Sequence, residues 1–378
     1  MKISTWMIEN GKNGQNGKLV SKNNRDEESA AWLQLIHYSG ISRSEKMATL
    51  ERVNGDIEAT IRILQDRFRS TKHVIEAELS WLTAPDHYLL PITDPRYPQK
   101  LRQISDPPLA LYVKGDLSLL EQAQVAIVGS RRPSPVGSRC AELMATELTQ
   151  LGLVITSGMA LGIDGVAHRS ALNVEKGKSV AVLAHGLDII YPHRHTQLCG
   201  QLADFGVLVS EYPLGVGVNK YRFPERNRIV SGLSLGVVIV EAAERSGTLI
   251  TARLACEQNR ELMVVPGSAL SAQYRGSHRM IQDGAALVTN AQDVIACLFN
   301  ELESILKLKK ENDLSTVLYA DEKVEHPLLS FIGADSTSID EIVLASGLSA
   351  AEVSSELLLM ELEGYIAVSN DGGFVNLS

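Results

Sequence analysis

Basic and aromatic side chains are interleaved in the segment Asn219–Arg228, which reads NKYRFPERNR. Its four basic residues and one acid give a charge of +3, and Tyr221 and Phe223 lie among the cations. Single-stranded nucleic acids are bound by cations that follow the phosphates and by rings that stack on the bases. A duplex, whose bases are already stacked, would make little use of these rings. The segment therefore predicts contact with a single strand, and the alternative is a solvated loop with one core phenylalanine.

The proline in this segment predicts its local conformation. Phe223 precedes Pro224 and should be extended. Alternation along an extended chain would place Tyr221 and Phe223 on one face. Lys220 and Arg222 would then lie on the other face, where they could follow a phosphate backbone.

Pro224 also suits the first turn of a helix that runs to Ser231. On such a helix Arg226 and Arg228 would lie about 200° apart, so they cannot share one role. We expect one of these arginines to reach a phosphate. The other should pair inward, with Glu241 or Asp164.

A second polar and basic cluster, GSRRPS at residues 129–134, directly follows the apolar run Val125–Val128. If that run is a strand of a parallel sheet, its carboxyl end and the next helix form a ligand crevice. Free amides and the helix dipole attract anions there. Gly129 permits close backbone approach, and Arg131 or Arg132 can grip a phosphate. A tight turn with solvated arginines is the alternative.

Two further turns have the same character. The stretch SGMALGID at residues 157–164 has glycines for tight turning and ends in Asp164, which can cap the following helix. The stretch SGTLITA begins with Ser246, Gly247 and Thr248 after another apolar run. Each turn can add amides to a phosphate pocket or simply begin a helix.

Other chemistries fit less well. The turn at Gly129 lacks the GxGxxG fingerprint, and the second predicted strand ends in Thr156-Ser157 without the acid that holds a ribose hydroxyl, so NAD binding is not expected. The sequence has no GxSxG nucleophile elbow, and no nucleophile–base pair follows from spacing. No spacing fixes a geometry for the nearby metal-ligating side chains either, so we expect no metal and no cofactor from His185, His193, His195 and Cys199.

The elements that must position these residues alternate between Tyr88 and Phe299, where short apolar runs are separated by amphipathic stretches such as Ser138–Gln150 and Gly165–Val174. Apolar, β-rich runs are typical of strands covered on both faces. The pattern predicts a Rossmann-like, doubly wound α/β domain with a mostly parallel sheet over residues 88–300. The predicted strands are Val125–Val128, Leu153–Thr156, Val180–Ala184, Val207–Val209, Val237–Val240 and Leu262–Val265.

Two smaller modules flank this domain. After a polar leader (residues 1–28), residues 29–84 have helical periodicity interrupted by turns at Ser39-Gly40 and Asn54-Gly55. After a charged linker (residues 301–315), residues 316–378 predict a helix at Ser338–Ala345, a turn, a helix at Ala350–Leu362 and a hairpin. Helix-turn-helix followed by a two-stranded wing is typical of a winged helix.

Charge is unevenly distributed over the chain. The net charge is -9, but residues 301–378 carry -11, which leaves +2 for the first 300 residues. Contacts to phosphate are therefore expected upstream of residue 301. The polar leader has no apolar core of a secretory signal, and no apolar run approaches the length of a membrane span. The four scattered cysteines indicate reduced thiols, so we expect a cytoplasmic protein without membrane contact.

Several of these motifs occur together, in order, in one known family. VAIVGSRRPS, TSGMALGIDGVAH, GLDIIYP, SEYPLG, FPERNRIVSGLS, VVIVEAAERSGTLITA, VVPG and GSHRMIQDGA together resemble the DNA-processing protein A (DprA/Smf) family over residues 88–299. The amino-terminal module is similar to the SAM-like domain of that family, and the tail is similar to its winged helix.

This resemblance implies a non-enzymatic, homodimeric protein that protects incoming single-stranded DNA and loads the recombinase RecA during natural transformation, the process of competence. The stretch GSHRMIQDG at residues 276–284 matches the family near its dimer surface. Met280 and Ile281 are adjacent there, so one may be expected to face the core and the other a partner. The residue patterns and the resemblance together predict a DNA-binding set of Gly129, Ser130, Arg131, Arg132, Ser134, Gly158, Lys220, Arg222, Phe223, Arg226, Asn227, Arg228, Ser246, Gly247 and Thr248.

Two competing interpretations remain open. The Gly-Thr turns also resemble the Rossmann-like nucleotide phosphoribohydrolases, which need PGGxGTxxE. Here the corresponding stretch reads ERSGTLITA, with Ala252 and Arg253 where an acid is wanted. Duplex binding through the tail is disfavoured by its charge, because residues 331–378 hold eight acids and no Lys or Arg.

Overall fold

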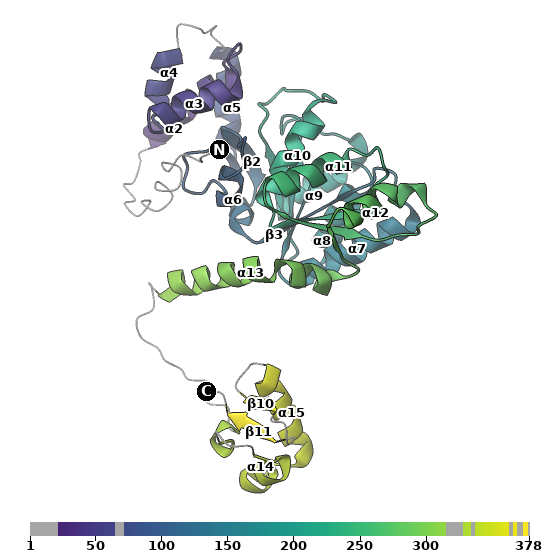
Figure 1. The fold of residues 1–378 in the computed structure, drawn as a ribbon. Coiled ribbons are helices and arrows are strands. Elements are labelled where there is room, and N and C mark those ends of the chain that lie inside the picture. The colour runs from purple at the N-terminus through teal and green to yellow at the C-terminus, as the bar shows by residue number, and fades with distance from the viewer. Residues whose placement is uncertain are drawn as a thin grey trace. The chain divides into compact units, whose positions relative to one another are not determined.

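The protein is described by a computed structural model that covers residues 22–64, 72–314, 328–333, 337–362, 366–368 and 373–376 (Figure 1). The chain divides into two compact units, Met1–Lys307 and Leu308–Ser378. The predicted polar leader lies outside the described residues up to residue 21, and helix α2 already begins at Lys22.

The larger unit is built on one nine-stranded sheet with the strand order β1-β2-β6-β5-β4-β3-β7-β8-β9. All neighbours from β6 to β9 are parallel, whereas β1 and β2 join the β6 edge in antiparallel pairs. The prediction of a mostly parallel sheet is confirmed. Its strands are β1 (His87–Pro91), β2 (Ala110–Gly115), β3 (Gln124–Gly129), β4 (Val154–Ser157), β5 (Ser179–Leu183), β6 (Val207–Ser210), β7 (Gly236–Val240), β8 (Glu261–Val265) and β9 (Ala286–Leu287).

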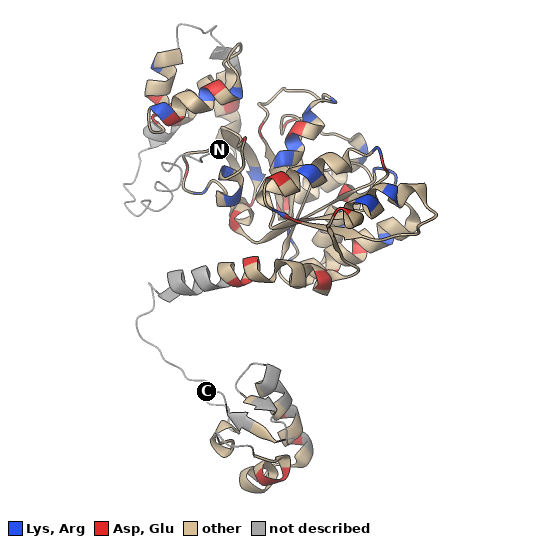
Figure 2. Ribbon diagram, in the orientation of Figure 1, with Lys and Arg blue, Asp and Glu red and all other residues tan. Residues whose placement is uncertain are grey.

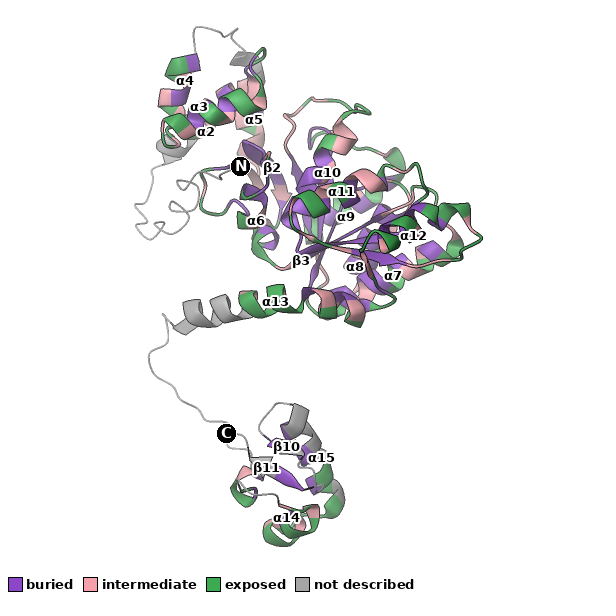
Figure 3. Ribbon diagram, in the orientation of Figure 1, coloured by how far each residue is buried: buried purple, intermediate pink, exposed green. Residues whose placement is uncertain are grey.

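Helices cover both faces of this sheet, and the strands are buried between them (Figure 3). Side chains alternate along a strand, so β3 contributes to both layers. Val125 and Ile127 belong to one apolar cluster with α7, α8 and α13, whereas Ala126 and Val128 belong to another with α10 and α11. These helices are α7 (Pro135–Gln150), α8 (Ile163–Asn173), α10 (Arg222–Leu233), α11 (Thr248–Glu257) and α13 (Ala291–Leu314), with α6 (Gln99–Arg102), α9 (Thr196–Phe205) and α12 (Arg275–Gln282) beside them.

The strand order creates a crevice between β3 and β7. The chain proceeds from β3 through β4 and β5 to β6 on one side of β3, and β7 then pairs with the other side. In open α/β sheets such a reversal leaves the carboxyl ends of the two strands uncovered. The turns at Gly129 and at Ser246 therefore lie at the same edge of the sheet.

Within the described residues, the amino-terminal module has four helices: α2 (Lys22–His37), α3 (Arg43–Arg52), α4 (Ile57–Leu64) and α5 (Lys72–Leu82). The turns predicted at Ser39-Gly40 and Asn54-Gly55 separate the first three of them. Trp32, Leu33, Leu35 and Leu50 are fully buried and share one apolar cluster with the adjoining part of the sheet domain. Ser42 caps α3 by accepting the Glu45 N–H. This module therefore packs on the sheet domain within the same compact unit.

The segment predicted as a linker, residues 301–315, is helical through Leu314, because α13 runs from Ala291 to Leu314 without a break. The charges misled the prediction, since they lie on a helix that also packs inward. Leu302 and Ile305, one turn apart, pack against the core of the larger unit, and Glu301 pairs with Lys100 at 2.7 Å. Within the described residues, no helix is both long and apolar enough to cross a bilayer.

The smaller unit has its own core. Helices α14 (Ile339–Ser346) and α15 (Ala350–Leu362) precede an antiparallel hairpin of β10 (Ile366–Val368) and β11 (Phe374–Asn376). Ser338 and Glu341 form a capping box at α14, and Gly347 ends that helix at a φ of 71°. The predicted order of two helices and a wing is confirmed. The core of this unit includes Leu328, Ile342, Val353, Leu357, Met360, Ile366 and Phe374.

Candidate nucleic-acid interface

A cavity of about 450 Å³ lies at the crevice between β3 and β7, and we call it the switch-point pocket. It is lined by the turn after β3, the turn after β7 and the start of α10. Three cationic side chains line it besides the buried Arg226, namely Arg131, Lys220 and Arg245. Ten of the predicted binding residues line this pocket: Gly129, Ser130, Arg131, Lys220, Phe223, Arg226, Asn227, Ser246, Gly247 and Thr248.

The two strand-to-helix turns are joined directly by hydrogen bonds. The Thr248 hydroxyl donates to the Gly129 carbonyl at 3.2 Å, and the Ser246 hydroxyl accepts the Thr248 N–H at 3.2 Å. A Cβ at Gly129 would lie 1.9 Å from the Val240 carbonyl oxygen, so the close approach of these strand ends requires glycine. The turns therefore present their amides and hydroxyls as one surface.

Ser134 does not line the pocket, contrary to the prediction, because Glu241 engages it. The Ser134 N–H donates to Glu241 at 3.0 Å, and its hydroxyl donates at 2.6 Å while accepting the Gly137 N–H. Glu241 is fully buried and has a φ of +62°, in the left-handed region. This carboxylate therefore holds the amino end of α7 instead of pairing with an arginine of α10. Arg132 is exposed and also lies outside the lining.

In the segment Asn219–Arg228 the helix begins at Arg222, so Phe223 is helical where an extended conformation was predicted. Asn219 accepts the Tyr221 N–H with its side chain at 3.0 Å and the Arg222 N–H with its carbonyl at 3.1 Å, which starts α10 at Arg222. Pro224 lies in the first helical turn, as predicted, where a missing N–H leaves no partner unsatisfied. The asparagine turn thus outweighs the proline's preference for an extended residue before it.

The helical conformation separates residues that an extended chain would have placed on one face. Tyr221 is 68% exposed with the Lys220 ammonium 5.0 Å from its ring centroid, whereas Phe223 is half-buried. Arg222 turns away from the pocket, donates to the Gly217 carbonyl at 2.6 Å and lies 5.2 Å from the Tyr212 ring centroid. The predicted pairing of Lys220 with Arg222 on one face is therefore wrong.

Arg226 forms the floor of the pocket. It is 3% exposed and donates to the carbonyls of Gly158 and Val182. Burial lowers the pKa of Arg226 to about 10 against the opposing charge of Asp164. Asp164 in turn accepts the Gly158 and Ala160 N–H groups at 3.2 and 3.3 Å, and burial raises the pKa of Asp164. Arg226 thus organises the β4–α8 turn and contributes positive potential to the pocket.

Arg228 is the arginine that pairs inward, although not with the predicted partners. Its guanidinium bonds Glu211 and lies 3.4 Å from Asp106, and its side chain is 7% exposed. It does not line the switch-point pocket. Both arginines are buried, Arg226 on backbone carbonyls and Arg228 on acids, so the expectation that one of them reaches a phosphate stays a prediction. Glu211 belongs to the motif SEYPLG, whereas Asp106 belongs to none of the motifs.

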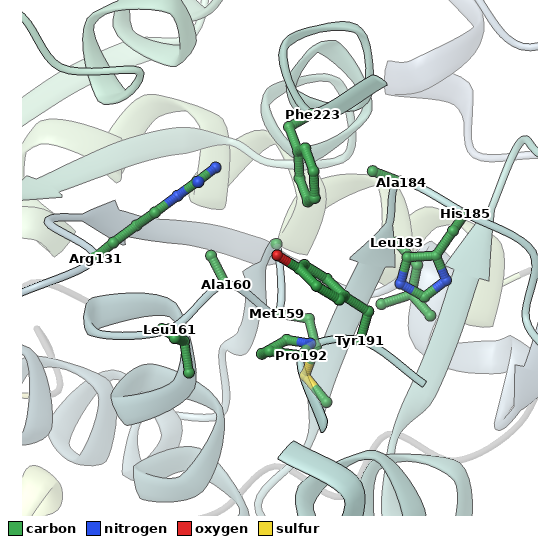
Figure 4. A pocket seen from close by; sticks show the side chains of 11 residues that line it. Arg131, Met159, Ala160, Leu161, Leu183, Ala184, His185, Tyr191, Pro192 and Phe223 are labelled. Atoms are coloured by element: carbon green, nitrogen blue, oxygen red, sulfur yellow. The ribbon is translucent and has the colours of Figure 1, made fainter. Parts of the chain in front are cut away.

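A smaller cavity of about 60 Å³ adjoins the switch-point pocket, and we call it the aromatic pocket (Figure 4). Phe223 lies between the two, with the Arg131 guanidinium carbon 5.3 Å from its ring centroid and the Tyr191 centroid 5.9 Å away. The Tyr191 ring meets His185 edge-on at 6.3 Å. Predicted residue Gly158 lines this second cavity. A planar base could therefore meet aromatic faces directly beside the cationic pocket.

Sequence reasoning missed Tyr191 and Arg245. Tyr191 is 42% exposed, and the signals that could have found it are the scarcity of aromatic residues, 5% of the sequence, and its place in the motif GLDIIYP. Arg245 is in the loop before α11, and its charge was the only available signal. Figure 2 shows Lys and Arg on α10, α11 and α12.

Two of the three histidines considered as metal ligands contact the backbone through their rings. The His185 Nδ1 lies 3.0 Å from the Gly186 carbonyl oxygen, and the His195 Nδ1 lies 3.2 Å from that of Met159. Within the described part of the chain, no three His, Cys, Asp or Glu side chains gather as a metal site. Met280 is 8% exposed in the sheet-domain core, while its neighbour Ile281 is half-buried.

Comparison with known proteins agrees with the fold and the motifs. The model of the family "DNA recombination-mediator protein A" matches residues 88–299, more than half of the chain. The chain belongs to this family, DprA/Smf. A separate model, the DprA winged helix domain, matches residues 315–372, which confirms the winged helix.

Relatives and solved structures cover most of the chain. Protein Smf of Escherichia coli is 42% identical over 84% of this chain and 85% of its own length. DNA processing protein DprA of Streptococcus pneumoniae is 44% identical over 54% of this chain and 72% of its own. The X-ray structure of that species' DprA has a TM-score of 0.62 and 36% identity, covering 71% of this chain and 97% of its own. DNA processing protein A of Helicobacter pylori, whose structural report describes a single-stranded DNA binding mode, has a TM-score of 0.50 and 34% identity, covering 54% of this chain and 93% of its own.

Proposed function

We propose that this protein binds single-stranded DNA in the switch-point pocket. The observation that supports this most directly is the contact between Arg131 and Phe223 at the pocket's rim, beside Lys220. A cation, a ring and a turn rich in free amides are the groups that a phosphate and its base require together. The single-stranded DNA described for the Helicobacter pylori protein is consistent with this assignment.

In the cell the protein would act in the cytoplasm as a homodimer. It would protect incoming single strands and load the recombinase RecA during natural transformation, without catalysing a reaction. These finer roles rest on membership of the DprA/Smf family. The pocket geometry supports the first step, which is holding the strand.

Fluorescence anisotropy of labelled oligothymidylate against a duplex of equal length tests the binding step. The single strand should bind more tightly, and the logarithm of its affinity should fall linearly with the logarithm of salt concentration. Equal or tighter binding of the duplex would contradict the assignment. For the loading step, RecA filament formation on strands covered by a single-strand-binding protein should begin sooner when this protein is added.

The nucleotide-hydrolase interpretation finds little support in the two carboxylates at this sheet edge. Glu241 does not line the pocket, and both of its oxygens lie 3.0 Å from the Ser134 nitrogen. Asp164 does line the pocket, but it is only 7% exposed and accepts two backbone N–H groups, so little carboxylate surface is available for a glycosidic cleavage. Incubation with nucleoside monophosphates tests this directly, and released base would establish the enzyme reading.

A further inference from the structure

The segment from Glu211 to Tyr221 connects β6 to α10 and carries Lys220 to the switch-point pocket; we call it the connecting segment. It contains no helix or strand of its own. The amino-terminal module contacts it at two places, each through a charged side chain.

The first contact is made by Glu78 of α5, a fully buried carboxylate. It accepts the Leu214 N–H at 3.0 Å and the Tyr112 hydroxyl of β2 at 3.1 Å. The His37 Nε2 of α2 lies 2.6 Å from its second oxygen. One acid therefore joins two helices of the module, a core strand and the connecting segment.

The second contact is made by Arg43 at the start of α3. Its Nη1 donates to Glu211 at 2.8 Å, while its Nε donates to Asp106 at 2.8 Å. The same Glu211 oxygen accepts from Arg228 of α10. Two arginines and two acids thus tie the module to the first residue of the connecting segment and to the helix that follows it.

The rest of the segment transmits this placement to the pocket. Its middle is fixed by two bonds to the loop that carries Tyr191: Gly215 N–H donates to Asp188 at 2.9 Å, and Gly186 N–H donates to the Val216 carbonyl at 2.9 Å. Arg222, the residue directly after the segment, lies over the ring of Tyr212 near the segment's beginning, so the two ends of the segment are held together. The Tyr212 hydroxyl donates to Glu225 of α10 at 2.9 Å.

We propose that Arg43 and Glu78 are positioning residues for single-stranded DNA, which hold the connecting segment so that Lys220 and Phe223 meet Arg131 at the pocket. The inference rests on the proposed function. Ordering a loop on binding weakens affinity, and a segment already held in place avoids that loss. The amino-terminal module thereby becomes part of the DNA-binding apparatus without touching the strand.

The variants Arg43→Ala and Glu78→Ala test this, with Glu78→Gln and Lys100→Ala as controls. Arg43 is a third exposed and its removal leaves Glu211 paired with Arg228, so that variant should fold. Glutamine can still accept the Leu214 N–H and donate to His37. Lys100→Ala breaks a comparable contact, between α6 and α13, that does not involve the connecting segment.

Two measurements are made on each full-length variant. Without DNA, amide hydrogen exchange should quicken at residues 214–221 in Arg43→Ala and Glu78→Ala, and stay as in the wild type in Lys100→Ala. With oligothymidylate, the two alanine variants should bind about tenfold more weakly, roughly the loss of one stacked base. Glu78→Gln should recover most of the affinity.

A double-mutant cycle separates positioning from general destabilisation. In a Lys220→Ala background, Arg43→Ala should weaken binding much less than in the wild type, since the group it positions is gone. Fully additive losses, or unchanged exchange and affinity in both alanine variants, would overturn the proposal. If the wild-type protein fails to bind single strands, the proposed function itself is refuted. If the wild type binds and the two alanine variants bind equally well, only the positioning role is refuted.

Discussion

The Arg131 guanidinium carbon lies 5.3 Å from the centroid of the Phe223 ring. Arg131 comes from the turn after β3 and Phe223 from the first turn of α10, nearly a hundred residues later. Their contact brings the cationic and aromatic parts of the site together at the sheet edge (Figure 4). The contributions of the two residues can be separated experimentally, because a phosphate contact depends on salt and a stacking contact does not.

Arg131→Ala should weaken binding of oligothymidylate and lower the slope of log affinity against log salt by about 0.7, the share of one single-strand phosphate. Lys220→Glu should act in the same direction and more strongly, because it also places a negative charge in the pocket. Anisotropy titrations over a salt series measure both quantities. Arg139→Ala is the matched control, since Arg139 is 62% exposed on α7 and outside the pocket. An unchanged slope in Arg131→Ala would remove Arg131 from the phosphate contacts.

Phe223→Ala should weaken binding by about 1–3 kcal/mol and leave the salt slope unchanged, because stacking on a base involves no counterion release. Phe223→Tyr, which keeps the ring, should retain most of the affinity. Anisotropy titrations over a salt series measure the affinity and the salt slope of both variants. Wild-type affinity in Phe223→Ala would show that this half-buried ring serves only the core.

The sheet could be predicted from sequence because its six central strands are continuous apolar runs between helices, which is how doubly covered parallel strands appear. The antiparallel strands β1 and β2 and the short edge strand β9 were missed. His87–Pro91 is short and ends in proline, whereas Ala110–Gly115 is an apolar run between Pro107-Pro108 and Gly115-Asp116, a signal that was overlooked. Charge patterning also failed at residues 301–314, where a helix continues because Leu302 and Ile305 pack inward.

The location of the site at the sheet edge could be predicted, because it follows from the order of the strands. Apolar runs followed by Gly-Ser-Arg and Ser-Gly-Thr turns indicate a common sheet edge, and the pocket contains both turns. Side-chain direction was not predictable. Whether Ser134 faces a ligand or Glu241 depends on the backbone at Glu241, and the partners of Arg228 come from segments distant in sequence.

Self-association is predicted to depend on Ile281 and not on Met280. Met280 is 8% exposed within the core, whereas Ile281 is half-buried beside it. In sedimentation velocity at micromolar concentration the wild type should be a dimer, and Ile281→Glu should be a folded monomer. Met280→Glu should instead lower the melting temperature, because it buries a charge. A monomeric wild type would contradict this prediction, as would an intact dimer in Ile281→Glu.

Stability should decline in acid partly through His168 of α8. Burial, together with the positive charges of His195, Arg226 and Arg169, lowers the pKa of His168 to about 3. Its Nδ1 lies 2.7 Å from the Ser179 hydroxyl, which itself donates to the Ile155 carbonyl, so the neutral ring donates from Nδ1. The native state thus takes up the His168 proton less readily than the unfolded chain does. Its contribution to stability is complete above about pH 6.5 and is lost as the pH falls toward 3.

Urea unfolding between pH 7 and pH 4 measures this dependence. Because one histidine contributes at most about 1.4 kcal/mol per pH unit, His168→Asn should flatten the decline by less than that amount. His193→Asn, at an exposed position, is the surface comparison. An equally steep decline in His168→Asn would show that His168 does not contribute to the acid sensitivity.

The winged helix is predicted not to contact DNA. Duplex-reading helix-turn-helix modules place Lys or Arg against phosphates. Residues 331–378 contain eight acids and no Lys or Arg, so the field of this module repels a polyanion. Its charge suits a protein partner.

A truncation after Leu314 keeps α13 whole and removes 11 acids and one lysine. It should bind oligothymidylate at least as tightly as the full chain, with the largest gain at low salt, where repulsion is least screened. Anisotropy at two salt concentrations measures this, with circular dichroism to verify the fold. If the tail affected only solubility, the truncation and the full chain would have equal affinities at each of the two salt concentrations. A folded truncation with clearly weaker binding would restore the winged helix as a DNA contact.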